Sequence, residues 1–183
     1  MFARTERLLL RPGWREDAPA LCQAIGDARI VRNLAKAPWP YRLEHAEAFL
    51  ARDPRPHEAS CLIFLRGDGA ATLVGGIGFG RTPAHELEFG YWVARPYWGQ
   101  GIATEAGRAL LANARDSLRL PRLVAGHFVD NPASGRVLQK LGFRPTGVTR
   151  GRYSAGRGAI APCREFALEL VEAETEAACA LAA

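Results

Sequence analysis

The chain has 183 residues, of which 48% are hydrophobic and 23% charged, with a formal net charge of +5. These proportions are typical of a globular protein and exclude a disordered chain, and the length suits one domain with its own hydrophobic core. No apolar run approaches the roughly 20 residues that cross a bilayer, and the run at 8–10 is too short for a signal-peptide core. We therefore expect a cytoplasmic protein with no membrane partner.

The first half of the chain predicts two helices and four strands. We expect a strand over 6–11, a helix from the capping residue Asp17 to residue 25, a helix over 43–51, and strands over 59–66, 71–80 and 86–94. The glycines of the segment 67–69 indicate a hairpin turn between the second and third strands. In the helix over 43–51, Ala46, Phe49 and Leu50 are expected to face the core.

The second half predicts alternating helices and strands. We expect a helix over 102–114, a buried strand over 122–129, a helix over 131–141 that ends at Gly142, a strand from 143, and a last strand over 163–171. This order predicts an α+β or α/β domain with a mostly continuous sheet. The domain is expected to span 1–171, and an alanine-rich tail over 172–183 is expected to form a frayed helix.

The cysteines and histidines show no spacing that is typical of a metal site. The cysteines are Cys22, Cys61, Cys163 and Cys179. No two of them form a C-x-x-C pair, and the segment 85–89 lacks the second histidine of a zinc-protease motif. We expect no metal and no disulfide framework.

A basic segment spans residues 136–157 and contains no acidic residue. Its basic residues are Arg136, Lys140, Arg144, Arg150, Arg152 and Arg157. Such a cluster fits a solvated basic face, a local anion site or a nucleic-acid surface, and the charge alone leaves these alternatives open.

The turn after the strand over 86–94 has the features of an anion site. Gly99 and Gly101 precede a helix, glycine lets the backbone come close to a ligand, and the first N–H groups of a helix have no partner within it. With the helix dipole, these groups favour phosphate oxygens. Ile102 and Ala103 replace the Lys-Ser/Thr of a nucleotide P-loop, and position 104 lacks the third glycine of a dinucleotide fingerprint.

The segment over 98–103 resembles the coenzyme A pyrophosphate loop of the GNAT family of N-acetyltransferases, with Trp98 in place of the family's Gln or Arg. Four further stretches resemble the family in the same order: 5–11, 73–78, 88–92 and 131–143. The loop and its helix, over 101–106, complete a set that covers about residues 5–145. The branch that they resemble acetylates the N-termini of ribosomal proteins.

The resemblance implies a single α+β domain with a mixed, mostly antiparallel sheet flanked by helices. It also implies acetyl-CoA as co-substrate and a set of binding residues. The backbone of the turn would hold the pyrophosphate: Trp98, Gly99, Gln100, Gly101, Ile102, Ala103 and Thr104. The strand at Tyr91, Trp92 and Val93 would splay from the strand over 122–129, and the pantetheine arm would bind in the gap like an added strand. An N–H near Tyr91 would then polarise the thioester carbonyl.

The helix over 131–141 completes the expected coenzyme site. The resemblance implies that Asn131 binds the end of the pantetheine and that Ser134 protonates the leaving thiolate. Arg136 and Lys140 follow on the same helix, and their charge and spacing suggest contacts with the adenosine phosphates.

Transfer also needs a group that takes a proton from the amine. Glu88 is the first candidate, directly or through a water, and Glu86 on the same strand face is the second. A carboxylate that only holds local amides is an equally open interpretation of Glu88. In the N-terminal-acetylating branch a carboxylate is expected at position 153, where this chain has Tyr153, which could order a water, donate a proton or simply pack.

These observations predict an acetyl-CoA-dependent N-acetyltransferase in which the amine attacks the thioester directly in a ternary complex. The acceptor is a protein N-terminus, such as that of a ribosomal protein, or a small amine, and it would bind at the loops over 33–41 and 150–161. The alternatives are a non-catalytic acyl-CoA sensor and a nucleic-acid binder. Relatives often pair through edge strands, so a homodimer is a further expectation that the sequence leaves open.

Overall fold

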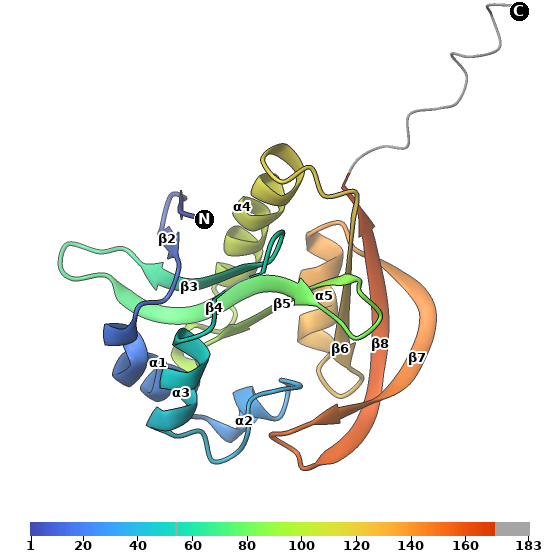
Figure 1. Ribbon diagram of the computed structural model, residues 1–183, viewed down its shortest axis with the longest axis horizontal. Helices are drawn as coiled ribbons and strands as arrows, with labels where there is room; N and C mark the ends of the chain where they lie inside the picture. Colours follow the sequence, from blue (N-terminus) through green and yellow to red (C-terminus); the bar gives the residue numbers. More distant parts are fainter. Residues whose placement is uncertain (54, 171–183) are drawn as a thin grey trace, which may run out of the picture.

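An eight-stranded sheet runs through the structure, a computed structural model that describes residues 1–53 and 55–170 (Figure 1). The strands are β1 (Ala3–Arg4), β2 (Leu8–Arg11), β3 (Ala59–Leu65), β4 (Thr72–Arg81), β5 (Leu87–Val93), β6 (Arg122–Phe128), β7 (Arg144–Ser154) and β8 (Ala159–Glu169). The helices are α1 (Ala18–Ile25), α2 (Ala28–Val31), α3 (Leu43–Leu50), α4 (Ile102–Asp116) and α5 (Pro132–Lys140). The predicted tail over 172–183 lies outside the described residues.

The strand order is β1-β2-β3-β4-β5-β6-β8-β7, and the sheet is mostly antiparallel. Only β5 and β6 pair in parallel among the described strands. Helix α4 connects them, since a parallel pair needs a long crossover. The architecture is the predicted α+β domain with a mixed sheet. No helix in the described ranges is long and apolar enough to cross a bilayer.

Helices cover both faces of the sheet, and β3 contributes to both cores. Ile63 belongs to the larger core with Leu110 of α4, whereas its neighbour Leu62 belongs to a second core with Leu21 of α1. Successive side chains of a strand point to opposite faces, so a strand covered on both sides reads as a continuous apolar run. Helices α1 and α3 lie together on one side of the sheet in Figure 1.

The structure differs from the sequence predictions in several local features. Helix α2 was not predicted, because it has only one turn and is too short to show a periodic pattern. The Asp27 carboxylate caps this helix by accepting a hydrogen bond from Arg29 N–H. Phe49 of α3 is 37% exposed rather than inward, because α3 meets α1 over a narrow stripe that includes Ala46 and Leu50. Strand β8 begins four residues before the predicted start at 163, where it pairs with the end of β7.

Asp17 sits at the start of α1 but its side chain binds Arg11 instead of the helix. Arg11 donates to both carboxylate oxygens, at 2.7 and 2.8 Å, and Trp14 N–H donates at 2.7 Å. The Arg11 guanidinium lies between the rings of Trp14 and Phe64, at 3.9 and 4.1 Å. Burial raises the pKa of Asp17, but the bonds from Arg11 and Trp14 outweigh it, and the net pKa lies below 3.8.

The Asp17→Asn variant is expected to lose about 2 kcal/mol of unfolding free energy at pH 7, because it removes one partner of a nearly buried pair. The pKa of Asp17 is lower in the folded than in the unfolded protein. The pair's contribution to the free energy of unfolding is therefore complete above the unfolded pKa and is lost as pH falls through the folded pKa. Urea unfolding at pH 7 and at pH 3 should therefore show a smaller difference between variant and wild type at pH 3. Asp116→Asn, in an exposed pair with Arg115, should leave stability unchanged. An equal loss at both pH values would contradict this assignment.

Candidate active site

A cleft of about 470 Å³ opens in the sheet where β5 and β6 separate. The parallel ladder between the two strands includes Glu88 with Val124 and Phe89 with Ala125, and it ends there. Beyond these pairs, the last residues of β5 and β6 line the cleft from opposite sides. The splayed parallel pair that the resemblance implies is therefore present.

The β5 wall presents backbone donors to the cleft. Ala94 N–H donates to Val74 O at 2.8 Å, and bonded and non-bonded pairs alternate along an antiparallel ladder. The N–H groups of Tyr91 and Val93 therefore point away from β4 and toward the gap. Tyr91, Trp92 and Val93 all line the cleft, and the free donors can bind an extended ligand arm as an added strand.

The turn between β5 and α4 is built on two glycines in a left-handed conformation. Gly99 has φ +76° and Gly101 has φ +77°, which costs roughly 1–2 kcal/mol for a residue with a Cβ. The first bond of α4 runs from Glu105 N–H to Gly101 O at 3.0 Å. Within the described part of the chain, the N–H groups of residues 99–104 have no acceptor. This run of amides, which we call the amide cradle, lies at the positive end of the helix and suits a phosphate group.

Side chains of the turn hold the amide cradle in shape. Trp98 Nε1 donates to Val93 O at 2.6 Å, and Gln100 Nε2 donates to Pro96 O at 3.0 Å. Trp98 therefore fixes the turn to the end of β5. The predicted residues of the turn that line the cleft are Trp98, Gly99, Gly101, Ile102, Ala103 and Thr104. Gln100 does not line the cleft, because its side chain folds back on the turn.

Tyr91 and Ser134 meet across the cleft. Asn131 caps α5 by accepting from Ser134 N–H at 3.4 Å, and Tyr91 O–H donates to Ser134 Oγ at 3.1 Å. Helix α5 comes close to β6 at Gly135, where an added Cβ would lie 2.7 Å from His127 Nε2. Burial raises the pKa of Tyr91, so its phenol keeps its proton at neutral pH. Ser134 can thus receive one proton while it donates its own.

Glu88 and Arg152 form an ion pair near the end of the cleft where β5 and β6 still pair. Both terminal nitrogens of Arg152 donate to the carboxylate, with Nη2 to Oε2 at 2.7 Å. Arg152 lies on β7, which is separated from β5 by β6 and β8. Its side chain passes close to Gly126 of β6, where a Cβ added to the glycine would lie 3.5 Å from Arg152 Nη1. The hydrogen bond with Glu88 is the main cause of the raised pKa of Arg152. The pair orients the Glu88 carboxylate toward this part of the cleft.

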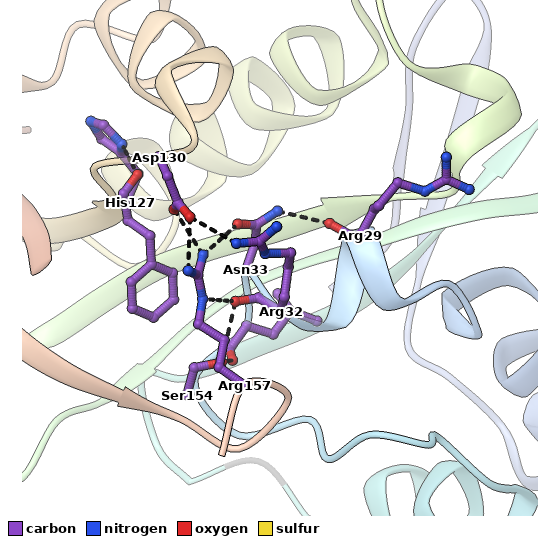
Figure 2. Close-up of polar contacts among 9 residues, drawn as sticks. Arg29, Arg32, Asn33, His127, Asp130, Ser154 and Arg157 are labelled. Atoms are coloured by element: carbon purple, nitrogen blue, oxygen red, sulfur yellow. Dashed lines mark hydrogen bonds and ion pairs between the residues drawn. The ribbon is translucent and has the colours of Figure 1, made fainter. Parts of the chain in front are cut away.

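Arg157, in the turn between β7 and β8, joins three segments around the cleft. It donates to both oxygens of Asp130 at 2.8 Å and to Arg32 O at 2.6 Å, and its guanidinium lies 4.6 Å from the centre of the Phe128 ring. Figure 2 shows Arg157 between Asp130 and Arg32, with Asn33 beside them at 3.3 Å from Arg157 Nη2. The network holds the loop after α2 against the end of β6 and the start of α5.

Parts of both expected acceptor segments line the cleft: residues 33–35 of the first and Arg152 of the second. The second segment, over 150–161, is not a loop but the end of β7, a short turn and the start of β8. Residues 33–35 are fixed from the hairpin, since Ser154 Oγ donates to Leu34 O at 2.8 Å and Ala155 N–H donates to Ala35 O at 3.0 Å. The sequence motifs do not single out these cleft residues. Their only sequence signal is their place within segments that contain proline or glycine and were expected to be loops.

The basic segment 136–157 is divided between two environments. Arg136 and Lys140 of α5 line the cleft. Other members pair with carboxylates from separate elements: Arg150 with Glu165, Arg152 with Glu88, and Arg157 with Asp130. Three of the six basic residues are therefore paired with carboxylates, which leaves less unpaired charge for a nucleic-acid backbone.

Two predicted candidates for proton transfer lie outside the cleft. Tyr153 is 57% exposed on β7 opposite Ile160, and this position favours the packing role over the catalytic one. Glu86 precedes β5 and lies 3.9 Å from Arg122 at the surface. Of Glu86, Glu88 and Tyr153, only Glu88 lines the cleft. No group of His, Cys, Asp and Glu in the described ranges could hold a metal ion.

Known proteins resemble this chain over most of its length. The family described as acetyltransferase (GNAT) domain matches residues 7–144. The chain is 27% identical over 171 residues to the N-acetyltransferase p20 of Bacillus licheniformis, covering 90% of this chain and 93% of p20. It is 40% identical over 73 residues to the ribosomal-protein-serine acetyltransferase of Escherichia coli, covering 39% and 41% of the two chains.

Solved structures share the fold. An acetyltransferase of the GNAT family from Bacillus anthracis has a TM-score of 0.79 and 24% identity, covering 93% of this chain and 99% of its own. The ribosomal α-N-protein acetyltransferase RimL, solved in complex with coenzyme A, has a TM-score of 0.77 and 21% identity, covering 92% and 98%. The family match over residues 7–144 together with this fold shows that the chain belongs to the GNAT family of acetyltransferases.

Proposed function

We propose that the protein is an acetyl-CoA-dependent N-acetyltransferase that acts on a primary amine by direct attack in a ternary complex. The amide cradle at residues 99–104 carries this proposal, because its free N–H groups and the positive end of α4 suit the pyrophosphate of coenzyme A. The cleft leads from the amide cradle between β5 and β6 to Glu88, and its volume of about 470 Å³ is typical of a small-molecule site.

The coenzyme would bind along the whole cleft. Arg136 and Lys140 would meet the adenosine phosphates, and the pantetheine amides would pair with the free edge of β5. Asn131 would hold the end of the pantetheine. The N–H of Tyr91, which faces the gap, would then donate to the thioester carbonyl oxygen as negative charge develops there.

The transfer would proceed without a covalent enzyme intermediate. The amine nitrogen attacks the thioester carbonyl carbon, a C–N bond forms and the C–S bond breaks. The surplus proton of the amine passes to Glu88, directly or through a water. The coenzyme A thiolate takes a proton from Ser134, and the Tyr91 phenol, which donates to Ser134 Oγ, replaces it. After the products leave, Glu88 releases its proton to solvent and the Tyr91 phenolate takes one from solvent, so both groups return to their starting states.

A protein N-terminus is the acceptor that we favour. An α-amino group has a pKa of about 7.7–8.0 and loses its proton near neutral pH far more readily than a lysine ammonium, with a pKa of about 10.4. The relatives named above include acetyltransferases of ribosomal proteins. Tyr153 stands where that branch is expected to have a carboxylate, so the acceptor sequence need not be the same, and a small amine is the second candidate.

Thermal unfolding with saturating acetyl-CoA tests the coenzyme assignment. A ligand at 100 times its Kd adds about 2.7 kcal/mol, which shifts the midpoint of a domain of this size by roughly 5–10 °C. We expect this shift with acetyl-CoA and none with ATP at the same concentration. No shift with acetyl-CoA would contradict the proposal.

An amine screen then separates the enzyme from a non-catalytic acyl-CoA sensor. Release of the coenzyme A thiol is followed with short peptides that carry a free N-terminus and with small amines such as polyamines and aminoglycosides. Turnover with one class supports the enzyme and names the acceptor class. Binding of acetyl-CoA without turnover by any amine would favour the sensor.

A further inference from the structure

An ion pair outside the cleft ties the first strands of the chain to the amide cradle. Glu105, in the first turn of α4, accepts from Thr5 Oγ1 at 2.5 Å, from Arg7 N–H at 3.0 Å and from Arg7 Nε at 2.8 Å. Arg7 Nη2 lies 2.6 Å from the same carboxylate and also donates to Gln100 O at 3.1 Å. Arg7 therefore contacts the helix and the turn at once.

The bond to Gln100 O orients one donor of the amide cradle. In a trans peptide unit the C=O and the following N–H point in opposite directions. The carbonyl of Gln100 points to Arg7, so the N–H of Gly101 in the same peptide unit points away from it. Gly101 has φ +77° and lines the cleft. A Cβ added to this glycine would lie 3.7 Å from Arg7 Nη2. Arg7 lies behind the turn and fixes the direction in which this amide faces.

The charge of Glu105 makes Arg7 necessary for an anion site. Burial raises the pKa of Glu105, but the hydrogen bonds from Thr5 and Arg7 outweigh it, and the net pKa is lowered. The carboxylate is therefore ionised at neutral pH and stands in the helix turn that would receive a pyrophosphate. An unpaired negative charge there would repel a second anion, and the guanidinium of Arg7 cancels it.

We propose that Arg7 is a positioning residue for coenzyme A: it orients the Gly101 amide through Gln100 O and neutralises Glu105 beside the pyrophosphate. Arg7 acts from behind the turn and touches neither the thioester nor the acceptor. The inference rests on the proposed coenzyme site, and a direct measurement of coenzyme A binding separates the failure of one from the failure of the other.

The test compares two arginines that hold the same segment. Arg66 donates to Thr5 O and Glu6 O, at 3.1 and 3.2 Å, and among the described residues it has no bond to the turn or to Glu105. We expect Arg7→Met to raise the Kd for coenzyme A about tenfold in isothermal titration. Arg66→Met should change it by less than about twofold, even if both variants lose thermal stability. Dephospho-coenzyme A keeps the pyrophosphate, so Arg7→Met should raise its Kd by the same factor.

A double variant tests separately whether Arg7 acts by neutralising the charge of Glu105. Glu105→Gln should bind coenzyme A at least as well as wild type, and Arg7→Met with Glu105→Gln should bind it more tightly than Arg7→Met alone. Equal weakening by the Arg7 and Arg66 variants would overturn the inference, because a loosened N-terminal segment would then explain both. Unchanged binding by a folded Arg7 variant would also overturn it. If wild type itself binds no coenzyme A, the proposed function fails instead.

Discussion

Replacing Gly101 with glutamate is expected to abolish acetyl-CoA binding in a protein that still folds. At φ +77° any side chain costs roughly 1–2 kcal/mol, and a carboxylate in the amide cradle adds repulsion toward the pyrophosphate. Together these effects should weaken binding by about 100-fold or more. Isothermal titration with coenzyme A measures the change, and circular dichroism with thermal unfolding shows whether the variant is folded.

Gly147 offers a matched control for this substitution. It lies on β7 with φ +84°, and an added Cβ there would meet no atom within 4 Å. Gly147→Glu therefore introduces the same residue at a similar positive φ outside the cleft. We expect it to lose a similar amount of stability and to bind coenzyme A as wild type does. A folded Gly101→Glu protein with wild-type affinity would show that the turn between β5 and α4 is only structural.

The turn and α5 could be predicted because their chemistry lies in consecutive residues. Gly99 and Gly101 mark a turn that needs positive φ, and both have it. Gly142 ends α5 with φ +91°, and Phe143 N–H bonds back to Leu138 O at 3.0 Å, as a predicted C-terminal glycine should allow. Such signals depend on backbone conformation within a few residues, which a single sequence reports directly.

The contacts that shape the far end of the cleft could not be predicted, because they join residues that are distant in sequence. Glu88 and Arg152 are 64 positions apart, and two strands separate the strands that carry them. Arg157 and Arg32 are 125 positions apart. Nothing in the local pattern of a basic loop says which carboxylate each arginine meets. Strand order decides it, and the residue pattern of a single sequence does not reveal strand order.

Glu88→Gln is expected to lower kcat by about 100-fold if Glu88 takes the proton of the amine, since general base catalysis is typically worth 10²–10⁴-fold. The coenzyme should bind as in wild type, because Glu88 lies away from the amide cradle. The rate is measured as thiol release with the acceptor found in the amine screen. Glu86→Gln is the control: this residue is on the same stretch of chain but is surface-exposed near Arg122, and its kcat should stay within about twofold.

Variants of Arg152, which pairs with Glu88, show whether this carboxylate is the general base or only a structural partner. If Glu88 is the base, Arg152→Met leaves the carboxylate in place and lowers kcat less than Glu88→Gln does. If Glu88 only holds Arg152, both single variants and the double variant should lower kcat by one common factor. That second pattern would remove Glu88 from the proton transfer and leave a bound water as the base.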